Sequence, residues 1–274
     1  MTRSLARLFR WRLALLNGVV AVGGFLLFPA RPTQGATMVA VLSGVALLAA
    51  AGSAFNQVQE RQLDRLMVRT RNRPLPRGDL TPAAAVAWGS GCLSAGLLVL
   101  RVGGGMLPVF LGMVALAWYL LVYTPLKRRT PLAVMAGGFC GALPPVIGWV
   151  SAGGSPADYR IILLAGLLYL WQMPHFWLFQ HRHAEDYRCA GLPLLPSYLG
   201  RLSPLGVCRL WIMALAAGSL LLPAFGLIAP SVVRWFAVGL GGLGALALSR
   251  NEAALFVGLN FFPLLLTLAF CFQG

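Results

Sequence analysis

Nine apolar runs, most of them about twenty residues long, divide this chain and limit what it can fold into. A helix of that length is long enough to cross the hydrocarbon core of a bilayer. The runs lie at residues 12–30, 37–55, 82–100, 106–124, 131–151, 161–179, 207–229, 232–249 and 253–272. The runs lack the alternating polarity that a membrane β-barrel would require. The sequence therefore predicts an all-α polytopic membrane protein with nine transmembrane helices.

The composition agrees with this prediction. Only 11% of the 274 residues are charged and 58% are hydrophobic, whereas soluble domains carry about a quarter charged residues. Neither a linker nor a low-complexity tract divides the chain. We therefore expect a single transmembrane domain over residues 1–274.

The positive charge is distributed unevenly between the two ends of the predicted helices. With nine spans, the amino-terminal end and alternate loops hold 18 of the 22 lysines and arginines, and the other four lie on the opposite side. The 18 are Arg3, Arg7, Arg10, Arg12, Arg61, Arg65, Arg69, Arg71, Arg73, Arg77, Lys127, Arg128, Arg129, Arg182, Arg188, Arg201, Arg209 and Arg250, and the four are Arg31, Arg101, Arg160 and Arg234. Basic loops remain on the cytoplasmic side. The pattern predicts a multi-pass protein of a bacterial inner membrane with a cytoplasmic N-terminus and a periplasmic C-terminus, and it explains the net charge of +15 without nucleic acid.

The stretch NQVQERQLDRLMVRTRNRPLPRG, residues 56 to 78, brings scarce acids next to many arginines. Asn56, Glu60 and Asp64 are spaced by four, which on a helix places three oxygen-bearing side chains in one stripe. Mg²⁺ prefers oxygen ligands and often shares them with substrate phosphates. The sequence thus predicts a magnesium site at the mouth of the second span.

The arginines that follow the stripe suggest what the metal would accompany. Arg69 and Arg73 could hold phosphate oxygens in bidentate fashion. The alternative is a solvated helix end at which the two acids pair with Arg61 or Arg65. Spacing alone leaves both possibilities open.

The stretch YTPLKRRTP, residues 123 to 131, repeats the four-residue spacing at the end of the fourth span. Lys127 and Arg128 could neutralise a diphosphate, and Tyr123 could donate to it. The alternative is an interfacial aromatic residue followed by a basic stop signal.

The stretch WQMPHFWLFQHRHAEDYRCAGLPLLP, residues 171 to 196, contains all three histidines and two of the seven acids. His175 follows Pro174, which we expect to bend the sixth span. A polar group in a span lines a cavity or meets a partner. His175 is therefore a candidate iron ligand, and the alternative is a hydrogen-bonded structural residue.

Together these stretches resemble the UbiA-type intramembrane prenyltransferases, in the branch whose acceptor is haem. That branch has the four-residue stripe, a Met-x-Arg-Thr-x-x-Arg-Pro-Leu-Pro run matched from Met67 to Pro76, and long motifs matched by residues 123–149 and 174–196. The resemblance covers residues 56–196; the last three spans match only in being apolar. Glu60 replaces an aspartate and Ala133 an asparagine of the family pattern. His183 and Tyr187 stand where the quinone branch has a second Asp-x-x-x-Asp, which argues against a quinone acceptor.

The resemblance implies a nine-helix UbiA-type bundle with its active-site loops on the cytoplasmic side. It implies a Mg²⁺-dependent enzyme that transfers farnesyl from farnesyl diphosphate to a vinyl group of haem B, with addition of water. It also implies that the protein has haem A synthase or the assembly proteins of terminal oxidases as partners. The resemblance implies that Asn56, Glu60 and Asp64 hold Mg²⁺, and that Asp186 holds a second Mg²⁺ or orients His183. It implies that the diphosphate is bound by Arg69, Arg73, Lys127 and Arg128, with help from Tyr123. It implies an acceptor site formed by His175, Trp177, His183, Asp186 and Tyr187.

Two rival functions stay open from the sequence. A transporter or non-catalytic haem or isoprenoid carrier would place polar residues and broken helices near the bilayer midplane, and Pro144 and Pro145 are expected to interrupt the fifth span. A UbiA-type enzyme with another aromatic acceptor is the second rival.

Overall fold

The computed structural model describes residues 2–29, 35–195, 203–249 and 251–272. Within these ranges every regular element is a helix. Arg31, Arg201 and Arg250 of the charge pattern and Pro196 of the third motif lie outside the described residues.

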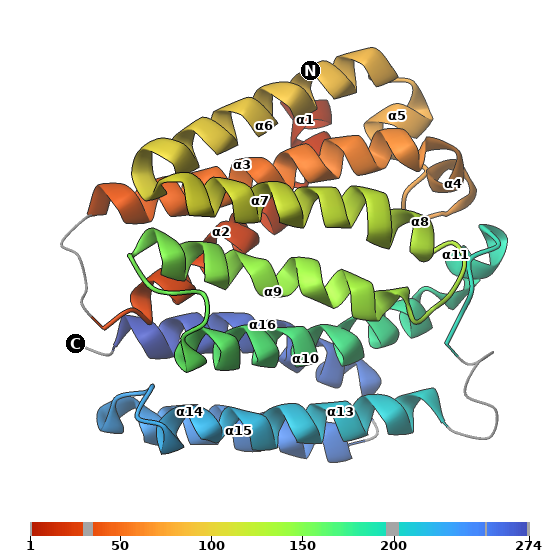
Figure 1. Ribbon diagram of the computed structural model, residues 1–274. Helices are drawn as coiled ribbons and strands as arrows, with labels where there is room; N and C mark the ends of the chain where they lie inside the picture. The colour runs from red at the N-terminus through yellow and green to blue at the C-terminus, as the bar shows by residue number, and fades with distance from the viewer. Residues whose placement is uncertain (1, 30–34, 196–202, 250, 273–274) are drawn as a thin grey trace.

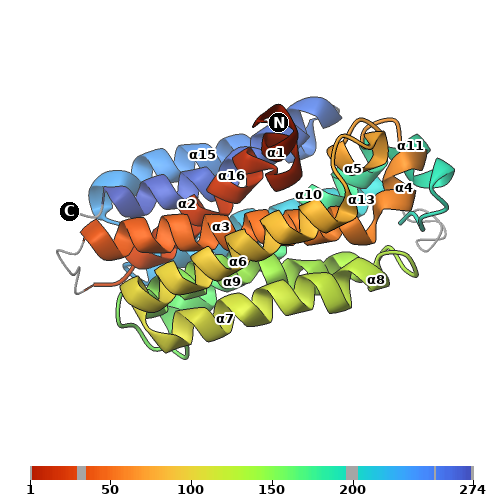
Figure 2. The same cartoon turned by 90° about the horizontal axis from the view of Figure 1, so that it is seen from above.

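Long helices run side by side and form one bundle (Figures 1 and 2). They are α2 (Trp11–Leu26), α3 (Gly35–Gln59), α6 (Pro82–Gly104), α7 (Met106–Ala117), α9 (Ala133–Ser151), α10 (Tyr159–Arg182), α13 (Pro204–Ser219), α15 (Pro230–Leu248) and α16 (Glu252–Cys271). Eight helical segments of the described chain are long and apolar enough to cross a membrane, and a ninth is obtained if α1 (Thr2–Phe9) and α2, which meet at a bend of 47°, form one span. The predicted nine-helix bundle is thus confirmed, with a bent first span.

Short helices gather at one end of the bundle in both views (Figures 1 and 2). They are α4 (Arg61–Leu66), α5 (Pro74–Arg77), α8 (Thr124–Leu126) and α11 (Ala184–Cys189). Three connections between long helices therefore meet at this end, and they contain the three motifs singled out in the sequence.

Prolines do not break the spans as expected. Helix α9 is continuous through Pro144 and Pro145, and α10 is continuous through Pro174. Neighbouring helices can satisfy the backbone groups that proline leaves free in a membrane helix. The prediction that the fifth span is interrupted was wrong, and His175 lies inside α10, in the sixth span, as the sequence predicts.

Two other spans differ from their predicted form. The run 207–229 ends earlier: α13 continues into a short helix α14 (Leu221–Ala224), and the span runs from Leu205 to Ala224. The run 106–124 continues α7 into a π-helical segment, η1 (Trp118–Tyr123), and then into α8. A π-helical turn has one residue more than an α-turn and often marks a functional site.

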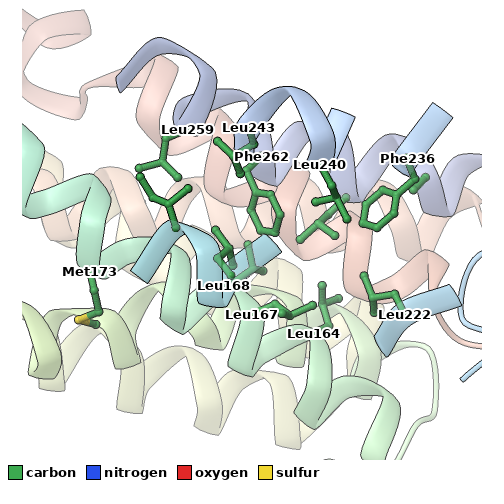
Figure 3. Packing of buried hydrophobic residues seen from close by; sticks show 14 of the residues in the cluster. Leu164, Leu167, Leu168, Met173, Leu222, Phe236, Leu240, Leu243, Leu259 and Phe262 are labelled. Atoms are coloured by element: carbon green, nitrogen blue, oxygen red, sulfur yellow. The ribbon is translucent and has the colours of Figure 1, made fainter. Parts of the chain in front are cut away.

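The main apolar core lies in the carboxyl-terminal half of the bundle. Leucines of α10 pack there against side chains of α14, α15 and α16, among them Phe236 and Phe262, which are 1% and 2% exposed (Figure 3). This packing fixes α10, the helix that faces the first-half helices with its other side.

Candidate active site

Asn56, Glu60 and Asp64 form a continuous stripe although a helix boundary falls between them. Asn56 lies in the last turn of α3, Glu60 joins α3 to α4, and Asp64 lies in α4. The backbone N–H of Glu60 donates to the Asn56 carbonyl at 2.9 Å, and that of Asp64 donates to the Glu60 carbonyl at 2.8 Å. The α-helical spacing is therefore preserved. All three side chains are buried, with at most 5% exposed.

Each carboxylate of the stripe is paired with a cation from a different part of the chain. Lys127 Nζ lies 2.6 Å from Glu60 Oε2, and Arg73 Nη1 donates to both oxygens of Asp64 at 2.9 and 2.8 Å. The alternative partners do not take these places, because Arg65 donates to Gln62 instead. The acids are thus part of a buried, charge-balanced cluster and not of a solvated helix end.

The π-helical segment fixes the orientation of the Asn56 amide. The Thr124 hydroxyl donates to the Tyr119 carbonyl at 2.8 Å and accepts from Asn56 Nδ2 at 3.2 Å. Because Thr124 has only one hydrogen to donate, the Asn56 nitrogen must face it. The amide oxygen of Asn56 is then the atom left for a ligand.

A cavity of about 380 Å³ opens beside this cluster and extends between the helices. Its polar end contains Asn56, Glu60, Asp64, Lys127 and Arg73, and its body is lined mainly by apolar and aromatic side chains. The aromatic residues of the lining are Tyr119, Tyr123, Trp171, Phe176, Phe179 and Tyr187. One end of the chamber thus suits a charged group and the rest an apolar one.

The stripe fits a hard divalent cation. Glu60 Oε1 is buried and has no hydrogen-bond partner among the described residues, and a buried carboxylate oxygen without a partner is rare in native structures. Two carboxylates and one amide supply oxygen donors of the kind that Mg²⁺ prefers. Within the described ranges three or more His, Cys, Asp or Glu side chains do not cluster as a metal site, so further ligands would come from substrate or water.

Burial changes the proton affinities around the stripe. It raises the pKa of Asp64, although the Arg73 guanidinium acts in the opposite direction. It lowers the pKa of Lys127, although Glu60 opposes this. Burial disfavours the charged form in both cases, and the oppositely charged partner of each group acts against it.

Two predicted acceptor residues line the cavity and two others are placed elsewhere. His175 and Tyr187 line the chamber. Trp177 is only 6% exposed and packs edge-on against Trp211 in the core. His183 lies against the Phe179 ring, with 4.7 Å between ring centroids. Neither Trp177 nor His183 lines the chamber in the described chain: Trp177 turns into the core from α10, and His183 lies between α10 and α11.

Asp186 and Arg128 contact other parts of the chain. Both Asp186 oxygens accept backbone N–H groups, from Val68 at 2.8 Å and Arg69 at 3.2 Å. Arg128 donates to the Gln59 carbonyl at 3.0 Å. Asp186 thus holds α11 against the segment after α4, and Arg128 contacts the end of α3; their metal and diphosphate roles stay predictions.

His175 is held between aromatic rings. It stacks on Trp171 and Phe256, with centroid distances of 4.8 and 5.5 Å. Its Nδ1 is buried without a hydrogen-bond partner in the described chain. Asn260 also forms a side-chain hydrogen bond with the imidazole. Packing and this bond thus fix the ring, with Nδ1 left free for a ligand.

Among the residues of the chamber wall that sequence reasoning missed are Arg10, Tyr119 and Gln172. Tyr119 could have been found, since it precedes Tyr123 by four residues and stacks on it at 5.8 Å. Gln172 donates to the Gly138 carbonyl at 3.2 Å. Arg10 had been counted only as a charge that sets the topology.

A membrane-spanning helical bundle in which carboxylates and cations close one end of an apolar chamber defines the class of intramembrane prenyltransferases. The chain belongs to the UbiA prenyltransferase family, whose model matches residues 17–253. It is 61% identical to a protein of Geobacter sulfurreducens named protoheme IX farnesyltransferase, over 98% of both chains. It is 44% identical to a protein of the same name from Oleidesulfovibrio alaskensis, over 91% of this chain and 87% of the relative.

Solved structures support the fold. A UbiA homologue from Aeropyrum pernix aligns over 95% of this chain and 98% of its own, with a TM-score of 0.78 and 22% identity. A UbiA homologue from Archaeoglobus fulgidus, solved with GPP and Mg²⁺, aligns over 98% of both chains, with a TM-score of 0.72 and 16% identity.

Proposed function

We propose that this protein transfers the farnesyl group of farnesyl diphosphate to a vinyl group of haem B, with addition of water, to give haem O and diphosphate. The observation that carries the proposal is the paired charge cluster at the polar end of an apolar chamber. The 61% identity to a protoheme IX farnesyltransferase over nearly the whole chain selects haem as the acceptor.

The charge cluster would stabilise the leaving group. Asn56, Glu60 and Asp64 would hold Mg²⁺, which compensates the negative charge that develops on the diphosphate; the solved homologue with GPP and Mg²⁺ supports this choice of metal. Once the acids have a metal to bind, Lys127 and Arg73 are free to turn from them to phosphate oxygens. Such preset charges lower the barrier without reorganisation during the reaction.

The chamber would bring the acceptor to the allylic carbon. The C–O bond to the diphosphate breaks and its electron pair leaves with the diphosphate. The π electrons of the vinyl group form the new C–C bond, and water adds to the resulting cation and loses a proton. The chain supplies no nucleophile in these steps: the apolar wall binds the isoprenoid, at about 0.8 kcal/mol per buried CH₂, and excludes other water.

The orientation in the membrane is part of the proposal. The basic ends of the helices would face the cytoplasm of a bacterial inner membrane, where a diphosphate is available, and the C-terminus would face the periplasm. The product would then pass to haem A synthase or to terminal oxidase assembly.

A mass measurement tests the activity. The purified protein is incubated with haem B, farnesyl diphosphate and Mg²⁺, and the extracted haem is analysed by mass spectrometry. The expected result is a gain corresponding to farnesyl plus hydroxyl, which is lost when Mg²⁺ is removed with a chelator. If no mass is gained while haem stays bound, a carrier is favoured; if another aromatic acceptor is prenylated instead, the haem assignment is wrong.

Replacing one acid of the stripe tests the metal role. We expect Asp64→Asn to lower turnover by at least about 100-fold, since it removes a metal ligand and the partner of Arg73. Asp79→Asn is the matched control, because Asp79 pairs only with Arg77 near the surface at 3.4 Å. Turnover is compared at equal amounts of membrane-inserted protein. A near-normal rate for Asp64→Asn would contradict the metal role.

A further inference from the structure

A second cleft adjoins the reaction chamber at its polar end. It lies between the α1–α2 bend and the segment after α4, and Arg10, Leu13, Arg69 and Arg73 line both it and the chamber. Its lining contains five arginines and no acid: Arg7, Arg10, Arg12, Arg69 and Arg73. A cleft with this lining attracts anions.

The backbone presents Arg10 to this cleft by an unusual conformation. Arg10 lies between α1 and α2 with φ 47° and ψ 50°, the left-handed region, and is the one non-glycine residue with positive φ in the described chain. Such a conformation persists only where the surroundings impose it.

Those surroundings are present on α3 and α5. Ser53 and Gln57 donate to the carbonyl of Leu8 at 3.0 and 2.7 Å and so satisfy the end of α1. Leu8 itself is fully buried, in a cluster with Ala54 and Leu75. The bend at Arg10 is therefore held by α3 and by α5. On α3, Ser53 lies one turn before Asn56.

The Arg10 side chain has no hydrogen bond or ion pair within the described residues. Asp64, the nearby acid, has both oxygens on Arg73. Arg10 is also accessible from the cleft and the chamber, since more than a third of its surface is exposed. A guanidinium in this state has its donors available for a ligand.

We propose that this arginine cleft binds the two carboxylates of the haem acceptor. The inference rests on the proposed function. The diphosphate is served by the metal that the acids would hold, by Lys127, which does not line the cleft, and by Arg73, which is paired with Asp64. The other four arginines of the cleft are left for a second anion. Carboxylates need no metal and match the guanidinium fork. The haem carboxylates lie at one edge of the ring, so their binding at the mouth of the chamber turns the opposite, vinyl-bearing side inward.

Haem and its dimethyl ester test this proposal in the full chain, reconstituted in nanodiscs of zwitterionic lipid. Binding is followed by absorbance, so the readout does not depend on turnover. Wild type is expected to bind the ester about tenfold more weakly than haem. Arg10→Gln is expected to bind haem about tenfold more weakly and to lose the distinction between haem and ester, whereas Arg10→Lys keeps part of it.

Arg71→Gln is the matched control, an exposed arginine of the same segment that lines neither cavity; it is expected to behave as wild type. Equal binding of haem and ester by wild type overturns the proposal and needs no variant. An Arg10→Gln variant that still distinguishes the two, but has a lower affinity for farnesyl diphosphate or for anionic lipid, overturns it too and identifies the anion. If haem gains no mass in the reaction while this binding pattern is intact, the proposed function is rejected and the proposal for the cleft is not.

Discussion

At the residue scale, the buried pair of Glu60 and Lys127 has a structural role, and the proposed function adds a catalytic one. Glu60 is 5% exposed and Lys127 a quarter exposed, and 2.6 Å separates their charged atoms. Removing one partner of a buried ion pair leaves an uncompensated charge, which costs more than the pair itself gains.

Lys127→Met should therefore lower the free energy of unfolding, by about 3 kcal/mol, and also slow turnover. The double variant Glu60→Gln/Lys127→Met should recover much of the stability and none of the activity. Unfolding is measured in detergent with Arg129→Met, an exposed neighbour that lines neither cavity, as control. A double variant that is as unstable as Lys127→Met would show that the pair is not the cause.

At the element scale, α2 and α9 approach so closely that only glycine fits at their contact. A Cβ added to Gly148 would collide with the Ala21 carbonyl, and one added to Gly24 would collide with the Pro145 carbonyl. Small residues allow membrane helices to pack backbone to backbone. This contact places α9, whose residues Gly137, Cys140 and Pro144 line the chamber.

Gly148→Ala is expected to destabilise the protein by about 1–3 kcal/mol, because a backbone must move to admit the methyl group. Gly166→Ala is the control, since nothing lies within 4 Å of the added Cβ there. Thermal inactivation of both variants is compared with wild type. Equal loss in the two variants would mean that helix crowding is not the reason.

The π-helical segment η1 has a second effect at this scale. The extra residue of η1 sets the rotation of Tyr123 and Lys127 about the helix axis relative to α7, because each residue of an α-helix turns the chain by about 100°. Deleting Leu121, which is 70% exposed, should restore α-helical geometry and lower turnover by about 100-fold through misplacement. Leu121→Ala keeps the length and should retain activity. Turnover is measured after insertion has been verified.

At the scale of the whole molecule, the two ends of the helical bundle differ in their charged groups. The ion pairs of the charge cluster lie at the end with α4, α8 and α11, and the turn between α9 and α10 lies at the other end (Figure 1). The charge cluster and the basic loops thus coincide at one end of the bundle.

Thiol labelling tests the proposed orientation. Cys189, exposed at the end of α11, should react with a membrane-impermeant maleimide only after the inner membrane is broken. Ala157→Cys, in the exposed turn between α9 and α10, should react in spheroplasts. Each thiol is tested with the other cysteines replaced by serine. The opposite pattern would reverse the orientation.

The sequence by itself determined the class of fold and the stripe of oxygen-bearing side chains, because both depend on local spacing. A run of about twenty apolar residues predicts a span whatever its neighbours are, and the four-residue steps from Asn56 to Asp64 persist across the boundary between α3 and α4. Local rules failed at Pro144 and Pro145, where packing keeps α9 continuous.

Only the tertiary structure decided which groups meet. Glu60 pairs with Lys127, 67 positions away, Asp186 holds the backbone at Val68 and Arg69, and Trp177 turns into the core. Arg10 joins the site through bonds between α1 and α3. These contacts depend on how separate helices cross and how each is rotated, and that is set by packing between distant segments, which spacing along one segment does not encode.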